Sequence, residues 1–535
     1  MDQECLSFRD VPGTSRLFLD FLQGSPQTRS FYPTSTLSLD ELASQTRSVT
    51  IPVERRHRVA DVLLRQNRAW NASSEALNNI DKLRGGACAV VSGQQVGLFL
   101  GPAYTLHKAI TIIRLARELT AKGIEAVPIF WLASEDHDLA EVNHAFVPDT
   151  SGELQRLQTS SEGCPDCPVG TVSLGSDVAS LVNELKRLVG ESETLDLVRS
   201  SYQPGKTFAT AFAELMTKLF SRHGLILLEP SDQELHQIGA PILQSAAEQA
   251  NELTRDLLSR SKELEAAGYH AQVKVTQSST LLFFLKEGRR SPIHHKNGGF
   301  SANGKQWTHD ELQREVKSKP ELFTANVLLR SVLQDYLLPT AAYIAGPAEI
   351  AYFAQSHVVY QRLLGKATPV WPRFSTTLIE ARLASWMRKY GLRLRDVLQP
   401  REDFLAALAK RTIPADMKDD FDRSREQLER LLAPLLHALK KLDPTIEAAG
   451  EVAARKMRHQ LQRLESRAAR AHLRREQVLD RHASMLSSLL FPEKELQERR
   501  LAGIYFLAKF GTELIDRLVE DYRPECHDHQ VIAPA

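Results

Sequence analysis

Short apolar runs alternate with longer amphipathic segments through the first two thirds of the chain. Five runs are apolar, short and bounded by loop signals: 87–91, 126–132, 225–228, 341–345 and 369–371. Helical patterns at 105–119, 233–259 and 350–364 follow or separate most of them. A succession of strand, crossover helix and strand predicts a parallel sheet covered by helices on both faces. The fold class expected is therefore α/β.

Two long segments interrupt this pattern. The first, 148–205, is turn-rich and contains D-T-S-G-E and S-E-G-C-P-D-C-P-V-G. The second, 262–325, contains alternating runs such as Q-V-K-V-T and L-L-F-F-L, with the turns E-G-R-R and K-N-G-G-F-S-A-N-G-K. Alternation with period two predicts strands, so the second segment is expected to be a small antiparallel module. Ahead of the core, 55–80 is expected to be helical.

The pattern changes again after 375, where a helical region rich in Leu, Ala, Arg and Glu begins. Apolar residues recur there in alternating steps of three and four, which is typical of a coiled-coil seam. The sequence L-D-P at 442–444 separates two such seams, so an antiparallel hairpin of long helices is expected. The seam positions are Leu428, Leu431, Leu435, Ala438 and Leu442, then Met457, Leu461, Leu464, Ala468 and Ala471.

The second long helix is basic, which raises the alternative of nucleic-acid binding. Its cations are Arg455, Lys456, Arg458, Arg463, Arg467, Arg470, Arg474, Arg475 and Arg481. The same residues could form the solvated outer face of a coiled coil, and no aromatic residues for base stacking accompany them. We therefore expect no nucleic-acid partner.

The composition is that of an ordinary soluble protein, with 25% charged and 42% hydrophobic residues among 535. The net charge of +1 gives no argument for nucleic acid or a membrane surface. The N-terminus, M-D-Q-E-C-L-S-F-R-D, lacks a basic segment followed by an apolar one, so no signal peptide is expected. No apolar run is long enough to cross a bilayer. Five cysteines without regular spacing fit a reducing compartment, so a cytoplasmic location is expected.

Cys164 and Cys167 form a single C-P-D-C motif in a Gly/Pro/Ser-rich stretch. A structural zinc site needs four ligands, and the chain has no second C-x-x-C pair. A redox motif would be expected at the start of a helix, which Pro165 within the motif and Pro168 after it do not favour. We interpret the segment as an exposed loop with two thiols.

Unusual polar loops follow three of the expected strands. The first is S-G-Q-Q-V-G-L-F-L-G-P-A-Y-T-L-H-K at 92–108, the second is S-E-D-H-D at 134–138, and the third is G-P-A-E-I-A-Y-F-A-Q at 346–355. N-V-L-L-R-S-V-L-Q-D at 326–335 precedes the fourth strand, and Arg373 and Ser375 follow the fifth. In open α/β sheets ligands bind beyond the carboxyl ends of the strands, so these loops are expected to converge on one site.

The chemistry of these loops suits an anion and a titratable amine. Glycine allows backbone to approach a ligand, proline is tolerated in a first helical turn, and helix N–H groups favour an anion. Lys108 could neutralise a phosphate or carboxylate. Three carboxylates around His137 suit proton transfer or binding of an amine. Plain alternatives remain open: Gly-Pro can be a turn, acidic residues can cap a helix, His107 can pack on the sheet, and His137 with His144 could bind a metal.

Several common motifs are missing. The chain has no G-x-x-x-x-G-K-[ST], no G-x-G-x-x-G after a strand and no G-x-S-x-G. These absences argue against a P-loop NTPase, a simple NAD enzyme and an α/β-hydrolase.

At these residues the chain resembles the cysteine ligase family of bacillithiol biosynthesis (BshC). The resemblance is carried by V-S-G-Q-Q-V-G-L-F-L-G-P-A-Y-T-L-H-K-A-I, F-W-L-A-S-E-D-H-D, E-V-N-H, N-V-L-L-R-S-V-L-Q-D-Y-L-L-P-T-A-A-Y-I-A-G-P-A-E-I-A-Y-F-A-Q and F-P-E-K-E-L-Q-E-R-R. It implies a Rossmann-type core like that of class I aminoacyl-tRNA synthetases, two connecting-peptide insertions and a C-terminal coiled coil that pairs subunits. The chain departs from the synthetases: T-L-H-K stands at the histidine-glycine-histidine signature, and no K-M-S-K-S follows the last strand.

The resemblance implies that the chain adds cysteine to glucosaminyl-malate in the last step of bacillithiol synthesis, as a homodimer. Amide formation in water requires an activated carboxylate, an adenylate or an acyl phosphate, so ATP or a related nucleotide is expected, with Mg accompanying it and no other metal. The expected domains are 1–147 (N-terminal helices and first half of the core), 148–205 (first insertion), 206–261 (core continued), 262–325 (second insertion), 326–375 (second half of the core) and 376–535 (coiled coil).

The candidate site residues fall into two groups. The expected catalytic residues are Lys108, Glu135, Asp136, His137 and Asp138. The expected binding residues are Gly93, Gln94, Gln95, Gly97, Gly101, Pro102, Tyr104, Thr105, Trp131, Ser134, Asn143, His144, Arg330, Gln334, Asp335, Gly346, Pro347, Glu349, Tyr352 and Gln355. Two other functions remain open: another nucleotide-dependent acyl or nucleotidyl transferase, and a coiled-coil interaction protein with a degenerate Rossmann domain.

Overall fold

The protein is described here from a computed structural model, which covers residues 4–33, 37–161, 163, 165–296 and 298–534. Its centre is a five-stranded sheet in which all neighbouring strands are parallel. In spatial order the strands are β13 (Val370–Pro372), β12 (Thr340–Ala345), β2 (Cys88–Gln94), β3 (Ala126–Leu132) and β6 (Ile226–Leu228). The five predicted strands and the predicted parallel pairing are confirmed.

The first strand is longer than the sequence suggested. It continues through Gln94 instead of ending at Val91, because Ser92, Gly93 and Gln94 pair with the last residues of β3. Glycine is required in this extension: a Cβ on Gly93 would lie 2.8 Å from the carbonyl oxygen of Trp131. The start of the expected polar loop is therefore strand.

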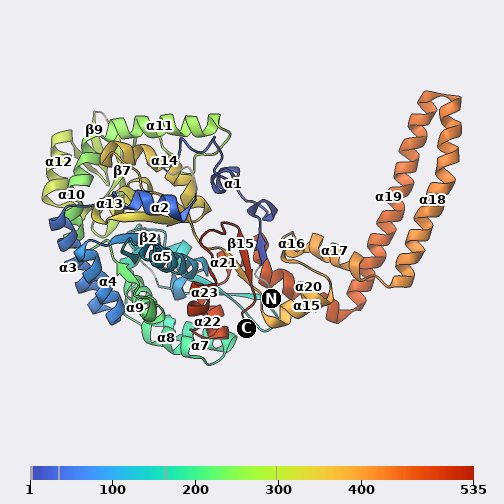
Figure 1. The fold of residues 1–535 in the computed structure, drawn as a ribbon, viewed down its shortest axis with the longest axis horizontal. Coiled ribbons are helices and arrows are strands. Elements are labelled where there is room, and N and C mark those ends of the chain that lie inside the picture. The colour runs from blue at the N-terminus through green and yellow to red at the C-terminus, as the bar shows by residue number, and fades with distance from the viewer. Residues whose placement is uncertain (1–3, 34–36, 162, 164, 297, 535) are drawn as a thin grey trace.

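Helices cover both faces of the sheet, as Figure 1 shows. On one face, Val91 and Ile129 pack against α3 (Val53–Ala69) and α4 (Ser74–Gly85). On the other, Val90 and Phe130 pack against α5 (Tyr104–Ala121) and α9 (Phe208–Leu219). Alternate residues of each strand thus enter different cores, which explains why the strands are apolar throughout.

Two expected helices are each divided. The helical region predicted at 55–80 is broken between α3 and α4 by Asn71, whose φ of 56° is left-handed, a conformation that asparagine tolerates. The one predicted at 233–259 is α10 (Gln233–Glu248) and α11 (Ala250–Ala266), separated at Gln249, where φ is −100° and ψ is 22°. Helix propensity and periodicity do not reveal such one-residue breaks.

Two excursions from the core carry their own structure. Between β3 and β6 lie α6 (Leu139–Val142), the hairpin β4 (His144–Pro148) and β5 (Leu154–Gln158), α7 (Asp177–Val189) and α8 (Glu193–Ser201). Between α11 and α13 lies an antiparallel sheet in the order β10-β9-β8-β7-β11. Its strands are β7 (Ser279–Lys286), β8 (Arg289–Lys296), β9 (Gly299–Ala302), β10 (Lys305–Trp307) and β11 (Phe323–Ala325), with α12 (His309–Ser318) between the last two. The predicted antiparallel strands are present.

Two further helices complete the core beside β12. Helix α13 (Val327–Leu337) precedes β12, and α14 (Pro347–Leu364) follows it. Glu349 caps α14 by accepting a hydrogen bond from the N–H of Gly346 at 2.7 Å. Both helices begin near the carboxyl ends of the central strands. Their first turns therefore border the candidate site.

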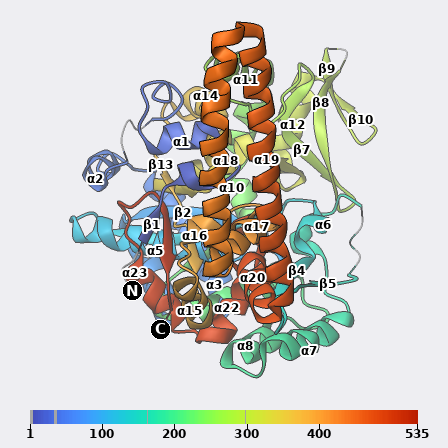
Figure 2. The same ribbon diagram turned by 90° about the vertical axis from the view of Figure 1, so that its right-hand side faces the viewer.

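The C-terminal region contains a long helical hairpin that projects from the body of the molecule (Figure 1). Helix α18 (Ala415–Leu442) and helix α19 (Pro444–Arg475) lie side by side, as Figure 2 also shows. The predicted break at 442–444 and the antiparallel arrangement are confirmed. The flanking helices are α15 (Ala381–Lys389), α16 (Leu394–Val397), α17 (Arg401–Thr412) and α20 (Gln477–Leu490).

The chain then returns to the core, which its helical composition did not indicate. Helices α21 (Gln497–Arg500), α22 (Gly503–Phe510) and α23 (Leu514–Asp521) follow, and Ile504 and Ile515 join the same core as α5. The last strand, β15 (His529–Ile532), pairs with both β1 (Glu4–Leu6) and β14 (Thr376–Leu378). This sheet brings the two ends of the chain together, while α1 (Arg16–Leu22) and α2 (Leu39–Thr46) lie between β1 and α3 in sequence.

Candidate active site

Two adjoining cavities open at the carboxyl ends of the central strands. The first has a volume of about 410 Å³ and the second of about 370 Å³. They share Ala133, Asp136, Val327 and Arg330. The loops predicted to converge at the carboxyl ends of the strands therefore do so in the structure, around two compartments with a common wall.

The second cavity is lined by the ends of β2, α5 and α14. Its walls include Gly93, Gln94, Gln95, Tyr104, Lys108, Glu141, Gly346, Pro347, Glu349, Tyr352, Arg373 and Arg499. Charged groups of both signs thus face each other across a space large enough for a small molecule.

Lys108 lies deep in this wall and is almost fully buried. Its ammonium donates to the carbonyl of Gly93 at 2.7 Å and to Oε1 of Gln94 at 2.9 Å, and it lies 2.8 Å from Oε2 of Glu349. A lysine ammonium has three donors, so all of them are taken. Burial lowers the pKa of Lys108, and Glu349 opposes that shift. The expected role of Lys108 as a free anion-binding charge does not fit these contacts.

Glu349 has a matching set of partners. Tyr343 donates to its Oε1 at 2.8 Å, and the backbone N–H of Gly346 donates to its Oε2. Burial alone would raise the pKa of Glu349, but Lys108 and these hydrogen bonds lower it below its ordinary value. The carboxylate is therefore held ionised in the wall of the cavity.

Arg330 stands where the two cavities meet. Its Nη2 donates to the hydroxyl of Tyr352 at 3.0 Å and lies 3.4 Å from that of Tyr343. Both partners are neutral phenols, so the positive charge of Arg330 has no carboxylate bonded directly to it among the contacts of the described residues. It is the cation best placed to bind an anionic group from either cavity.

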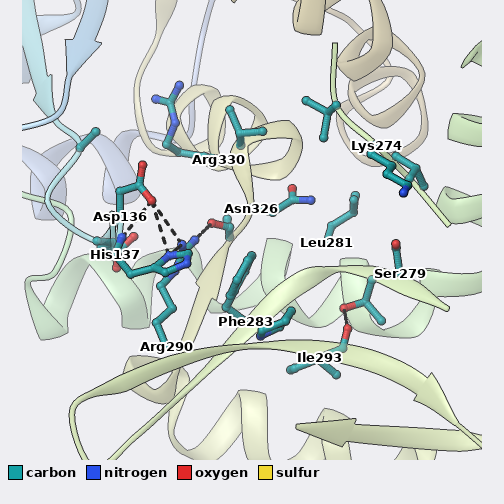
Figure 3. A pocket seen from close by; sticks show the side chains of 18 of the residues that line it. Asp136, His137, Lys274, Ser279, Leu281, Phe283, Arg290, Ile293, Asn326 and Arg330 are labelled. Carbon is teal, nitrogen blue, oxygen red and sulfur yellow. Dashed lines mark hydrogen bonds and ion pairs between the residues drawn. The ribbon is translucent and has the colours of Figure 1, made fainter. Parts of the chain in front are cut away.

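The first cavity lies between the S-E-D-H loop and the antiparallel module. Its lining includes Trp131, Glu135, Asp136, His137, Lys274, Phe283, Arg290 and Asn326. Figure 3 shows Asp136, His137 and Arg290 grouped at one side, with Phe283 beside them and Lys274 farther along the wall. The second excursion from the core therefore closes this cavity.

Asp136 is held by side chains from two distant parts of the chain. Nε2 of Gln95 donates to its Oδ2 at 2.8 Å and also to Oε2 of Glu141 at 2.9 Å. Arg290 Nη1 lies 3.8 Å from its Oδ1 and 3.2 Å from Nδ1 of His137. Asp136 is thus a fixed acceptor on the wall common to both cavities.

Arg290 comes from β8 and was missed in the sequence. Its Nε donates to Oγ1 of Thr324 at 2.9 Å, its Nη2 donates to the carbonyl of Ala325 at 2.8 Å, and its guanidinium lies 3.8 Å from the ring centroid of Phe283. Burial lowers the pKa of Arg290, opposed by Glu135 and Asp136. The E-G-R-R stretch signalled a hairpin turn, and nothing in its spacing indicated that the next strand would reach the site.

The residues beside Asp136 are tied to the protein behind the cavity. Ser134 is buried and donates to the carboxyl group of Glu229, which follows β6. Burial raises the pKa of Glu229 to about 7. Oε1 of Glu135 lies 2.9 Å from Nε2 of His236. Glu135 therefore lines the first cavity while its Oε1 is paired with His236. Ser134 stabilises the same loop through its bond to Glu229.

Some predicted site residues lie elsewhere. Gly97 and Gly101 belong to the loop that packs against Tyr202 and the C-terminal segment, and Pro102 forms a β-bridge with Ala502. Thr105 is fully buried in α5. None of these four is among the described residues that line the two cavities. The reason is that the C-terminal segment covers the loop.

Asp138, Asn143 and His144 are also outside both cavities. Asp138 caps α6 by accepting from the N–H of Glu141 at 3.2 Å. Asn143 and His144 begin the β4 hairpin, where His144 Nδ1 lies 3.4 Å from Arg156. The helix-cap alternative is therefore the correct one for Asp138.

Three further residues that were expected to bind a ligand have structural contacts instead. Gln334 and Asp335 are bonded to each other at 3.1 Å on the far side of α13, and Asp335 borders a separate cavity of about 380 Å³ near the start of β12. Gln355 pairs with the backbone of Val273 through two hydrogen bonds, at 2.8 and 2.9 Å. Gln334 lies one turn farther along α13 from Arg330, and Asp335 is rotated by about 140° from it around the helix, so neither side chain lines the two cavities.

No cluster of three or more His, Cys, Asp or Glu side chains suited to a metal ion occurs among the described residues. No helix in the described part of the chain is long and apolar enough to cross a membrane. The prediction for the C-P-D-C motif depends on Cys164, which lies outside the described residues.

Comparison with known proteins covers the whole chain. The family model described as "Bacillithiol biosynthesis BshC, N-terminal Rossmann-like domain" matches residues 1–374, and "Bacillithiol biosynthesis BshC, C-terminal coiled-coil domain" matches residues 376–534. A relative from Koribacter versatilis is 46% identical, over 99% of this chain and 100% of its own. Relatives from Solibacter usitatus and Salinibacter ruber are 37% and 32% identical, over 99% and 96% of both chains. All three carry the name "Putative cysteine ligase BshC".

Proposed function

The chain belongs to the BshC family of bacillithiol biosynthesis, and we propose that it joins the carboxyl group of cysteine to the amine of glucosaminyl-malate. The observation that supports this best is the pair of adjoining cavities that share Asp136 and Arg330. A ligase must hold two substrates with their reacting groups in contact, and a common wall meets that need. Their volumes of about 410 and 370 Å³ suit small polar molecules.

Asp136 and His137 are the groups best placed to act on the amine. An alkylammonium must lose a proton before its nitrogen can attack a carbonyl carbon, and a second proton leaves as the C–N bond forms. A carboxylate fixed by Gln95 can orient the nitrogen, and the adjacent imidazole can move a proton. Arg330 would bind a carboxylate of the acceptor or of cysteine.

We also propose that ATP or a related nucleotide supplies activation of the cysteine carboxyl group. The donor set of the second cavity fits an anionic phosphate chain: Arg330, Arg373 and Arg499 line it, whereas Lys108 already has its donors engaged. The departing group carries away the carboxyl oxygen as the amide forms.

The helical hairpin supports a homodimer. Leu436 and Leu439 of α18 face Gly450 of α19, where a Cβ would lie 2.7 Å from Leu439. The predicted seam lies on another face: Leu431 and Leu464 are 71% and 57% exposed. These seam residues are therefore not buried between the two helices of the hairpin. A second copy of the chain with the same seam would bury them.

The test is a ligation assay on the purified full-length chain with cysteine, glucosaminyl-malate and one nucleotide at a time, read by mass spectrometry. The proposal expects a product with the mass of both substrates less one water, and about 100-fold slower formation by Asp136→Asn. Asp40→Asn, on the surface, is the matched control and should behave as the wild type. Absence of product with every nucleotide would overturn a self-sufficient ligase.

A further inference from the structure

A segment of the C-terminal region forms part of the candidate active site. Residues 497–503 are bonded to the loop before α5: the N–H of Ala103 donates to Leu501 at 2.8 Å, and the N–H of Gly503 donates to Gly101 at 3.2 Å. Gly503 permits this approach, since a Cβ there would lie 2.7 Å from Leu106. The segment is thus fixed against the end of the central sheet.

Gln497 anchors the same segment to β14. Its Oε1 accepts from the N–H of Leu378 at 2.8 Å, and its Nε2 donates to the carbonyl of Leu378 at 3.1 Å. The Gln497 side chain therefore bonds the backbone of Leu378 as a neighbouring strand would. The next residue, Glu498, is consequently held at a defined position beside Arg373.

Glu498 is fully buried and has four partners. Oε1 accepts from Nη2 of Arg373 at 2.5 Å and from the hydroxyl of Ser375 at 2.8 Å. Oε2 accepts from the N–H of Thr376 at 2.9 Å and lies 3.0 Å from Nδ1 of His107. A carboxylate with this many donors is oriented in one way only, and so is the guanidinium bonded to it.

Arg373 continues from this contact into the wall of the second cavity. Its Nη1 donates to the carbonyl of Phe374 at 2.9 Å. Its Nε lies close to Gly346, since a Cβ on that glycine would be 3.3 Å from this nitrogen. Its guanidinium carbon lies 5.5 Å from the ring centroid of Tyr104, another residue of that wall. Glu498 therefore determines where Arg373 sits at the cavity.

Arg499, the residue after Glu498, lines the same cavity directly. Its closest carboxylate contact, to Glu495, is long at 3.9 Å, and its side chain is 47% exposed. Its charge is therefore available to a ligand. Glu498 thus affects the cavity through Arg373, whereas Arg499 lines it directly.

We infer that Glu498 is a positioning residue that holds Arg373 beside Arg499, and that these two arginines bind an anionic group of a reactant. The inference rests on the proposed function. Carboxylates of cysteine and glucosaminyl-malate and the phosphates of a nucleotide share the chemistry that a pair of guanidinium groups recognises. The C-terminal region is accordingly part of the active site as well as a helical hairpin.

Charge explains why Glu498 is needed. Arg373 lies near Lys108 and Arg330, and it disfavours the charged form of Lys108, whose pKa is lowered chiefly by burial and also by Arg373. Without Glu498, the buried guanidinium of Arg373 would lose its paired carboxylate. Burial opposes the ionised form of Glu498, but Arg373 and His107 bring its pKa well below the ordinary value.

The test compares Glu498→Gln and Arg499→Gln with the wild type in the ligation assay, with KM and kcat measured for cysteine, glucosaminyl-malate and ATP separately. We expect both variants to raise the KM for the same reactant by about tenfold or more, with a smaller change in kcat. The reactant affected identifies the anion. Glu493→Gln, just before this segment and paired with Arg500 outside the cavity, is the matched control.

Arg373→Lys replaces Glu498→Gln if the latter does not fold, and Arg499 is exposed enough for its variant to fold normally. Isothermal titration calorimetry with each reactant repeats the comparison without turnover. Unchanged KM and affinity for all three reactants in variants of an active wild type would overturn the inference. An inactive wild type would instead count against the proposed function, and calorimetry would then decide the inference alone.

Discussion

The ammonium nitrogen of Lys108 lies 2.8 Å from Oε2 of Glu349 and links helix α5 to the first turn of α14. With Gly93 and Gln94 as its other acceptors, Lys108 also holds the end of β2. This lysine thus joins three walls of the second cavity. Its charge is used to maintain the shape of the site, which leaves the arginines to bind anions.

Lys108→Met is expected to destabilise the protein strongly. It leaves Glu349 buried without its cation, a loss of about 3–5 kcal/mol in free energy of unfolding. The transition temperature, followed by calorimetry at neutral pH, should fall by several degrees. Lys122→Met removes a contact to Asp40, which is 89% exposed, and should leave the transition temperature nearly unchanged because water screens this surface pair. Equal effects of the two substitutions would contradict the role assigned to Lys108.

Arg290→Lys should impair catalysis with little loss of fold. A single ammonium cannot reproduce the forked contacts to Thr324, Ala325 and His137. We expect kcat/KM in the ligation assay to fall about 10- to 100-fold. Arg289→Lys, one residue earlier in β8 and exposed, is the control. Retention of full activity by the Arg290 variant would show that the first cavity does not depend on this arginine.

Glu229→Gln should change the pH dependence of stability. Burial raises the pKa of Glu229 from 4.5 to about 7, so the folded protein binds more protons than the unfolded chain between those values. This carboxyl group therefore stabilises the fold least at high pH. Glutamine does not ionise. The free energy of unfolding of the variant should therefore rise relative to that of the wild type as pH increases from 5 to 8, by at most about 3 kcal/mol.

The measurement is the transition temperature of both proteins across that pH range. Glu265→Gln, an exposed substitution in α11, serves as control. Ser134 and Ser231 can still donate to the amide oxygen of the variant, so the hydrogen bonds need not be lost. Parallel pH curves for the Glu229 variant and the wild type would refute the prediction.

Charge on the exposed seam should separate the subunits. Burying a leucine contributes about 1.5–3 kcal/mol, so Leu431→Glu with Leu464→Glu removes several such contributions from a dimer and adds repulsion. Light scattering after size exclusion should show a dimer for the wild type and a monomer for the double variant. Glu426→Gln, on α18, is the control. A wild-type monomer would contradict the proposed homodimer.

The sequence predicted the central sheet well, because strands buried on both faces are apolar throughout and loop residues interrupt them cleanly. It also predicted that loops after β2, β3 and β12 would converge, since the carboxyl ends of parallel strands share one edge. Asp136 and Glu349 were identified on that ground, and both line the cavities.

Contacts distant in sequence could not be predicted in the same way. Arg290 reaches His137 across 153 positions, and Glu498 reaches Arg373 across 125. No local periodicity encodes such pairs. For Glu498 and Arg499 there was a partial signal, because F-P-E-K-E-L-Q-E-R-R carries the family resemblance, but its position beside the site depends on the return of the chain to the core.

The binding of one substrate in each cavity is tested most directly by a crystal structure of the full-length chain soaked with cysteine and glucosaminyl-malate without nucleotide. We expect the two substrates to occupy the adjoining cavities, with the amine within hydrogen-bonding distance of Asp136 and a carboxylate on Arg330, Arg373 or Arg499. Well-ordered substrates bound away from both cavities, with these side chains unengaged, would contradict it.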